Sequence, residues 1–274
     1  MGLTVKELGA ILYGRNAERF GLLMLRAGFD ASMDSPAGVT VVGGYTGSIS
    51  EWEAVEKRWN AQLDIDEISS FRMTEMMRRF GLEIGLDRVE PYVKIVGESS
   101  LRGVYAVMLD TDWTKAAKDP EYLRVCPQRQ HACLDLLLTI LEEDMSTGVA
   151  ERPLMLVAFD NDYGNSEIAA RVYEAWRERT GHPGFAGITY AKGEAEWDSV
   201  PLQCADLLAW LTRRNPMWRQ QLERGTVAAP PPKMDKLFRL ALKASSQGRG
   251  AMWSDALAKS VAERLSQMKG ASGE

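Results

Sequence analysis

The chain is poor in the residues that most often build zinc centres and nucleophilic dyads. It has two histidines, His131 and His182, and three cysteines, Cys126, Cys133 and Cys204. Neither the histidines nor the cysteines show a ligand spacing, so a zinc site and a histidine-activated nucleophile are not expected. Three cysteines cannot form an even set of disulfides, and we expect small buried hydrophobic side chains in a reducing cytoplasm.

Long apolar runs are also lacking. No stretch of about 18 apolar residues could span a membrane, and Lys6, Glu7 and Arg15 interrupt the N-terminal segment, so no signal peptide is predicted. Gly43 and Gly44 are not followed by the Lys-Ser/Thr pair of a phosphate loop, which argues against nucleotide binding by that route. With 274 residues, of which 45% are hydrophobic, the chain can bury one sizeable α/β core. We expect a cytoplasmic protein without a membrane partner.

Hydrophobic periodicity predicts an alternation of strands and helices after an amphipathic N-terminal segment. Ser50 and Glu53 have the spacing of a capping box that opens the first helix of the core. Strands are expected at 22–29, 38–46, 103–109, 154–159 and 185–190, and helices at about 50–63, 120–143, 165–179 and from 200 onward. The segment 64–100 has no clear pattern and is expected to be an insertion after the second strand.

Three aspartates stand out at the ends of these elements. Asp30 and Asp160 each close an apolar run of strand length, and Asp206 lies with Gln203 on the edge of the apolar stripe of the last core helix. A carboxylate beside an apolar stripe or at the end of a buried strand needs hydrogen-bond donors, a cationic side chain or a metal ion. The plain alternatives stay open: the first two can stabilise turns, and Asp206 can pair with Arg213 or Arg214.

The order β-β-β-α-β-α-β-α, with the insertion left out, is that of the ribonuclease-H-like fold. It predicts an α/β protein with a mixed sheet flanked by helices and a helical C-terminal tail. In this arrangement the first and fourth strands are neighbours at the centre of the sheet, and the last helix crosses them. The three aspartates are therefore expected to converge.

Several motifs resemble those of one family. Residues 29–32 (Phe-Asp-Ala-Ser), 42–45 (Val-Gly-Gly-Tyr), 71–76 (Phe-Arg-Met-Thr-Glu-Met) and 201–209 (Pro-Leu-Gln-Cys-Ala-Asp-Leu-Leu-Ala) are similar to segments of the domain of unknown function 3800 family. The resemblance covers about residues 22–214, and its last motif is the most specific. It implies a ribonuclease-H-like fold and a metal-dependent nuclease activity. Ala31 and Arg72 depart from the family's usual Glu and His.

Clustered carboxylates favour a divalent cation with oxygen ligands, and Mg²⁺ or Mn²⁺ fits best. Asp30 and Asp160 are the expected ligands, Asp206 a ligand or water-positioning acid, and Gln203 an orienting side chain. A fourth acid is expected among four candidates, of which the first two are preferred as metal ligands: Asp198, Glu75, Asp162 and Asp135. Each also has a plain alternative: Asp198 can cap a helix, Glu75 can lie on a solvated helix face, Asp162 can stabilise a turn, and Asp135 can lie on the outer side of its helix.

Charge is distributed unevenly along the chain. Residues 211–274 carry 12 Lys and Arg against 5 Asp and Glu, whereas the whole chain has a net charge of −5. This basic tail could track nucleic-acid phosphates, or its charges could simply solvate helix faces. The expected organisation is a helical leader at 1–20, a ribonuclease-H-like domain at 21–214 and a basic helical extension at 215–274.

These observations favour a metal-dependent hydrolase of phosphodiester bonds, a nuclease. One alternative is a catalytically inactive module that binds nucleic acid or a protein partner. Another is the hydrolysis of a small nucleotide.

Overall fold

The computed structural model describes residues 25–34, 38–146, 155–160, 172, 174–176, 178, 185–191, 199–214, 232–243 and 249–252. In chain order the elements are β1 (Leu25–Asp34), β2 (Val39–Gly47), α2 (Ile49–Ile65), α3 (Met73–Gly97), β3 (Arg102–Leu109), α4 (Asp110–Ala116), α5 (Pro120–Val125), α6 (Arg129–Ser146), β4 (Met155–Asp160), β5 (Phe185–Ala191), α8 (Val200–Arg213), α10 (Pro232–Lys243) and β6 (Arg249–Met252). The predicted leader at 1–20 lies outside the described residues.

The strands form one mixed sheet in the order β5-β4-β1-β2-β3-β6. β2 runs antiparallel to both β1 and β3, whereas β4 is parallel to β1 and β5 is parallel to β4. β6 adds a parallel strand beside β3. The α/β class expected from the sequence is therefore confirmed, and β1 and β4 are neighbours inside the sheet.

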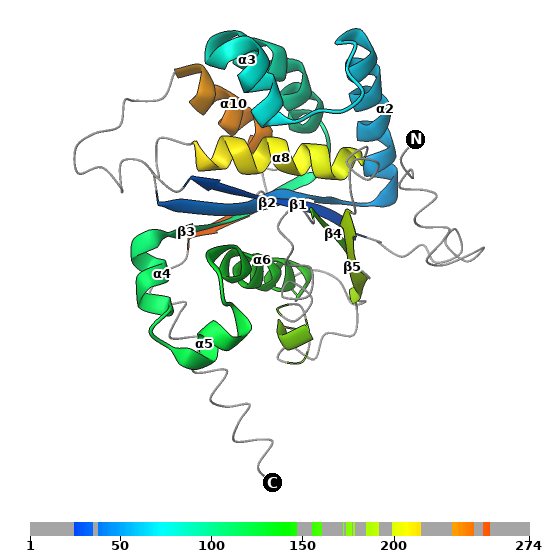
Figure 1. Cartoon of the computed structure of the whole chain (residues 1–274). Coiled ribbons are helices and arrows are strands. Elements are labelled where there is room, and N and C mark those ends of the chain that lie inside the picture. The colour runs from blue at the N-terminus through cyan, green and yellow to red at the C-terminus, as the bar shows by residue number, and fades with distance from the viewer. Residues whose placement is uncertain are drawn as a thin grey trace, which may run out of the picture.

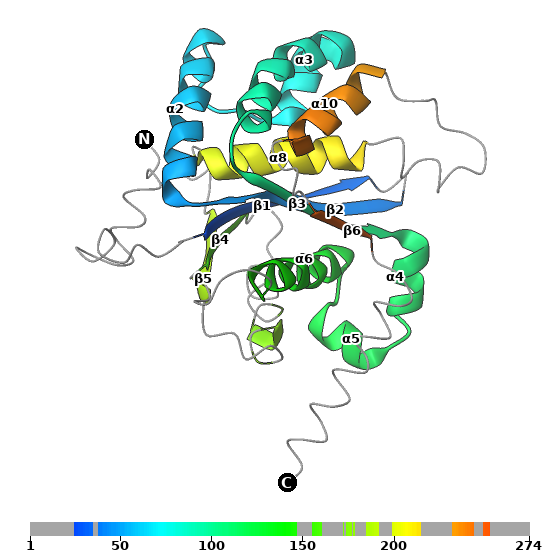
Figure 2. The ribbon, with the colours of Figure 1, turned by 180° about the vertical axis from the view of Figure 1, so that it is seen from behind.

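Helices cover both faces of this sheet. α8 lies across one face and packs on β1 and β2, with α2, α3 and α10 beyond it (Figure 1). α6 packs on the opposite face against β2 and β3, on the same side as α4 and α5 (Figure 2). None of the helices in the described part of the chain is long and apolar enough to cross a membrane.

Alternating side chains of β2 and β3 enter the two cores on either side of the sheet. Val41 and Val107 belong to the core beneath α8, whereas Val42 and Ala106 belong to the core beneath α6. Because the side chains of a strand alternate between faces, a strand covered on both sides reads as a continuous apolar run. This explains why periodicity located both strands to within one residue.

Gly43 marks the point where α8 meets the sheet. A Cβ atom added to Gly43 would lie 3.7 Å from the Cα of Ala209, at ordinary contact distance. The backbone of α8 therefore lies directly over β2 at this point, beside the centre of the sheet.

Asp30 was expected to close its strand, but β1 continues to Asp34. Three further local expectations were wrong. The capping box of α2 is formed by Ser48 and Glu51 rather than Ser50 and Glu53, because β2 continues to residue 47 and the turn comes directly after it. Glu51 Oε2 accepts from the Ser48 amide at 2.7 Å, and the Glu51 amide donates to Ser48 Oγ at 3.3 Å. The helix expected at 120–143 is divided into α5 and α6, with Pro127 in the break, where proline lacks an N–H and disfavours helix in the preceding residue.

The third correction concerns the tail. α10 is helical as expected, but residues 249–252 form the edge strand β6 rather than helix. The pairing partner of β6 is more than 140 residues earlier in the chain, so no local pattern could indicate it. The remainder of the predicted extension lies outside the described residues, as does most of the helix expected at 165–179; residues 172, 174–176 and 178 of that helix are helical.

The insertion after the second strand is a long kinked helix. α3 spans 25 residues, and Gly81 interrupts it with φ of 73° and ψ of 173°. Its inner face is buried against α2, α8 and α10. The insertion and α10 thus form an outer layer that rests on α8.

Candidate functional site

α8 supplies both polar side chains of the motif at 201–209. The helix begins after Ser199 with Pro201 in its first turn, a position where the missing proline N–H costs nothing. Gln203 is fully buried and Asp206 is 9% exposed. Both lie on the side of α8 that meets the outer helical layer, because their hydrogen-bond partners come from α2 and α3.

The Asp206 carboxylate receives the first amide of α3. Its Oδ2 atom accepts from the Met73 backbone N–H at 2.6 Å. Arg72, the N-cap residue of α3, provides no side-chain cap of its own. Since the first amides of a helix lack intrahelical partners and carry partial positive charge, a carboxylate from another helix is a favourable cap.

Gln203 binds two donors with one oxygen. Its Oε1 atom accepts from Trp59 Nε1 at 2.8 Å and from the Phe71 backbone N–H at 3.0 Å. The three bonds made by Gln203 and Asp206 together hold α2 and the peptide 71–73 against α8. We call this set of contacts the α8 bracket.

Three aromatic rings surround the bracket. The centroid of Trp59 lies 5.3 Å from Phe71 and 4.9 Å from Tyr92, and Phe71 lies 4.5 Å from Tyr92. Tyr92 donates its hydroxyl to Asp66 Oδ2 at 2.7 Å. Burial, followed by the hydrogen bond and the charge of Asp66, raises the pKa of Tyr92 well above its usual range. The tyrosine is therefore a neutral donor at physiological pH.

Asp30 and Asp160 lie side by side in the backbone register. Phe29 pairs with Phe159 across the parallel ladder of β1 and β4, and the two aspartates are the next residues on each strand. On the other side of β1, Asp30 pairs with Gly43, the residue that α8 approaches at Ala209. Asp206 precedes Ala209 by three residues on α8. The register thus places Asp30 and Asp160 on the sheet face that α8 covers, whereas the side chain of Asp206 meets the first turn of α3.

The candidates for a fourth acid occupy different places. Glu75 lies in the first turn of α3, where 59% of its side chain is exposed and Arg78 is 3.7 Å away, so it is on a solvated helix face. Asp135 is 3% exposed on α6, and the expectation that it lies on the outer side of its helix was wrong. Asp162 and Asp198 lie outside the described residues.

No group of three or more metal-binding side chains is found among the residues that the structure describes. For Asp30 and Asp160 the structure describes the strand backbone alone, so their role as metal ligands stays a prediction. The sequence reasoning missed the partners of Gln203 and Asp206. Phe71 falls inside the motif at 71–76, but an amide donor has no signature in a sequence.

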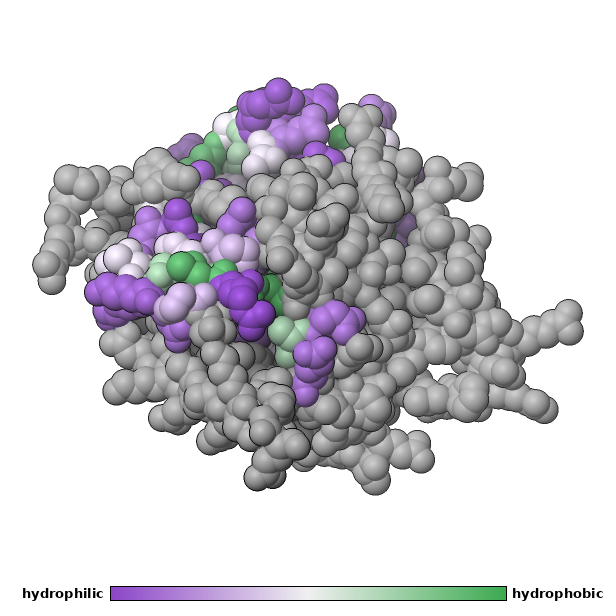
Figure 3. All heavy atoms as spheres, turned by 60° about the horizontal axis from the view of Figure 1, so that its bottom comes forward, coloured by the Kyte–Doolittle hydropathy of each residue, from purple (hydrophilic) through white to green (hydrophobic). Residues whose placement is uncertain are grey.

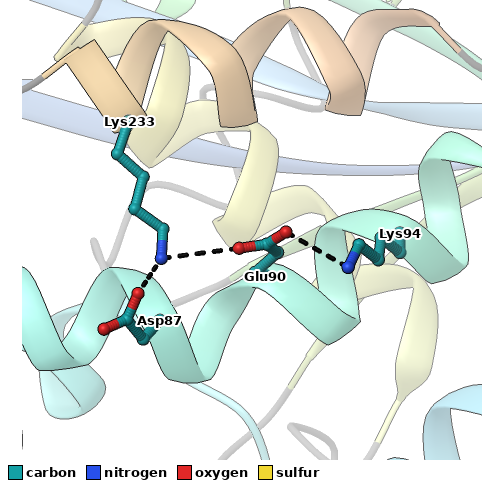
Figure 4. Close-up of polar contacts among 4 residues, drawn as sticks. All are labelled: Asp87, Glu90, Lys94 and Lys233. Carbon is teal, nitrogen blue, oxygen red and sulfur yellow. Dashed lines mark hydrogen bonds and ion pairs between the residues drawn. The ribbon is translucent and has the colours of Figure 1, made fainter.

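Two of the described basic residues of the tail, Lys233 and Arg239, are paired with acids. Lys233 of α10 pairs with Asp87 and with Glu90 of α3, the latter at 3.4 Å, and Lys94 meets Glu90 at 3.1 Å (Figure 4). Arg239 pairs with Asp235 at 2.7 Å. α10 is therefore folded back on α3 by charge as well as by apolar contact.

Phe238 lies among the basic residues of the tail, but it is only 6% exposed, and its ring centroid is 6.1 Å from that of Tyr105. Its ring belongs to the apolar core that includes α10, β3 and α8. It cannot serve as an exposed stacking platform in this arrangement.

Comparisons with protein-family models, with curated proteins and with solved structures find no match to this chain. The resemblance of the motifs at 29–32 and 201–209 to the domain of unknown function 3800 family stays a prediction. Function must accordingly be argued from geometry.

Proposed function

We propose that the protein is a ribonuclease-H-like hydrolase that cleaves phosphodiester bonds of nucleic acid with the help of Mg²⁺ or Mn²⁺. Support for the fold comes from the sheet. Its strands β3-β2-β1-β4-β5 combine an antiparallel meander with two strands parallel to β1, followed by a helix that crosses the centre. This is the strand order expected of that fold, with β6 added at one edge.

The observation that carries the proposal is the adjacency of Asp30 and Asp160 under α8. Residues paired across a ladder share a face of the sheet, so the register position of Asp30 belongs with Gly43 to the face that α8 covers. Asp160 has the equivalent position on β4. Two ionised carboxylates on neighbouring strands repel each other, and a cation between them relieves that repulsion.

The residues fit a hard divalent cation, which prefers carboxylate oxygens. Asp30 and Asp160 would hold the ion, which when bound supplies charge neutralisation for the attacking and leaving oxygens of the phosphodiester. Asp206 accepts from the Met73 amide through Oδ2 and would hold α3 in place on α8, above the two aspartates. Gln203 would keep the helical layer in register with the site.

A cleavage assay tests this proposal. Purified protein is incubated with single-stranded and duplex RNA and DNA, with a hybrid and with mononucleotides, in the presence of Mn²⁺ or a chelator. We expect cleavage that requires metal and falls at least about 100-fold in Asp30→Asn and Asp160→Asn, because each removes a charged ligand. The matched control is Asp235→Asn on α10, where the Asp235 side chain is 36% exposed, and it should cleave like the wild type.

One specific observation favours the second candidate, an inactive binding module. Both polar side chains of the motif at 201–209 already accept hydrogen bonds from the protein, so a structural role alone would account for them. This alternative predicts nucleic-acid binding that is insensitive to metal and to Asp30→Asn. A wild-type protein that binds nucleic acid but cleaves none of the substrates would favour this alternative.

A further inference from the structure

The kink of α3 carries two arginines stacked on one aromatic ring. The guanidinium carbon of Arg88 lies 4.2 Å from the centroid of Phe80, and that of Arg79 lies 5.0 Å from it. Gly81, with its positive φ, separates Phe80 from the second half of α3 and so allows Arg88 to reach back to the ring. We call Arg79, Phe80 and Arg88 the α3 stack.

The charge of this stack is not compensated within the described residues. Arg58 pairs there with Glu98 at 2.7 Å, and Lys94 and Lys233 are held by acids. Arg79 and Arg88 are exposed, and the described part of the chain offers neither of them a carboxylate within ion-pair distance. Two guanidinium groups beside one ring repel each other, and an anion bound between their N–H edges relieves that repulsion.

The exposed apolar side chains of the described residues do not indicate a binding surface of their own. In the view of Figure 3 the described residues that reach the surface are mainly hydrophilic, with small hydrophobic spots between them. The only large hydrophobic side chains that are clearly exposed among the described residues are Ile65 and Ile84. Ile84 lies one turn before Arg88, next to the stack.

The stack lies on the same helix as the amide that contacts Asp206. Phe80 follows Met73 by seven residues in the regular first part of α3, so it is about 10 Å along the helix from that amide.

We propose that the α3 stack is a subsite that binds the phosphate backbone of single-stranded nucleic acid. Arginine forks match phosphate oxygens in pairs, and the guanidinium planes and the adjacent apolar side chain can stack unpaired bases, which a duplex hides. This subsite would make single-stranded nucleic acid the substrate class of the proposed hydrolase. Its part in catalysis rests on that proposed function, but its binding of nucleic acid can be measured separately.

The test is a binding titration in a chelating buffer, where hydrolysis does not occur. Fluorescent oligothymidylate is titrated with the full chain, with Arg79→Gln/Arg88→Gln and with Arg58→Gln as the matched control. The double variant should bind about tenfold more weakly, and its slope of log affinity against log salt should be shallower by about 1.4, because two phosphate contacts are lost. All substituted side chains are exposed, so the thermal midpoints should stay close to the wild-type value.

Equal affinity and equal salt slope for the double variant and the wild type would overturn the subsite, as would the same loss in Arg58→Gln. Competition by polyglutamate as strong as that by unlabelled oligothymidylate would also overturn it, since the site would then be a general acidic-polymer site. The two proposals fail separately. Intact binding in the double variant of a protein whose cleavage needs Asp30 removes only the subsite, whereas stack-dependent binding by a protein that never cleaves removes only the hydrolase.

Discussion

Asp206 is a buried carboxylate that caps the first turn of a helix 133 residues earlier in the chain. Its bond to the Met73 amide replaces the cap that Arg72 does not provide. Asp206→Ala should lower the free energy of unfolding by about 1–2 kcal/mol, since a helix cap is lost. Asp206→Asn keeps an acceptor and should cost about half as much. Urea denaturation measures both, and Asp235→Ala, which changes a partly exposed side chain of α10, should stay within about 0.5 kcal/mol of wild type.

Gly38 is required by its backbone and by its neighbour. It has φ of +63°, and an added Cβ would lie 3.1 Å from Asp110 Oδ2. Gly38→Ala should cost about 1–2 kcal/mol for the left-handed conformation, plus the displacement of Asp110. Gly81→Ala should also destabilise the protein, because Gly81 has φ of +73° and ψ of 173°, a conformation almost confined to glycine, although nothing lies within 4 Å of the added atom. Unchanged thermal midpoints in both variants would contradict this account.

At the scale of elements, the α8 bracket holds the outer helices on the core. Gln203→Leu leaves the Trp59 indole N–H and the Phe71 amide without their acceptor in a buried place, and this should cost about 2–4 kcal/mol. Hydrogen exchange should then accelerate in residues 59–76 before it does in β2 and β3. Gln62→Leu, which removes only a bond to Asp66 one turn away, is the control and should leave that exchange nearly unchanged.

The elements that could be predicted are those whose pattern is local. Strands β2 and β3 and helix α8 follow from apolar runs and helical spacing, because each is buried as its pattern requires. α3 was not predicted, since it is buried on an irregular inner face and is broken by Gly81. β6 depends on pairing with β3, and pairing between distant segments leaves no mark on a short sequence.

The candidate site, too, could be predicted only in part from the sequence. The element order alone predicted that β1 and β4 would be neighbours, and the register confirms that Asp30 and Asp160 follow a paired residue on each. Sequence could also indicate that Asp206 and Gln203 are buried, from their place on the apolar stripe. It could not indicate that their partners are backbone amides at 71 and 73, because any residue could supply them.

At the scale of the whole molecule, opposite charges join segments that are distant in the sequence. Lys233 binds Asp87 and Glu90 and so attaches the described part of the basic tail to the insertion (Figure 4). The side chain of Lys233 is 31% exposed, so Lys233→Met should cost only about 1 kcal/mol and less at high salt. Urea unfolding at low and high ionic strength measures this, and a cost that grows with salt would contradict an ionic attachment.

The central claim is that Asp30 and Asp160 share a divalent cation beneath α8. Its most direct measurement is the binding of Mn²⁺ by calorimetry, together with the thermal midpoint, for wild type and Asp30→Asn/Asp160→Asn. We predict binding to the wild type, with a stabilisation of about 2.7 kcal/mol when the ion is at 100 times its dissociation constant, and neither effect in the double variant. Equal Mn²⁺ binding by both proteins, or none by the wild type, would contradict the account.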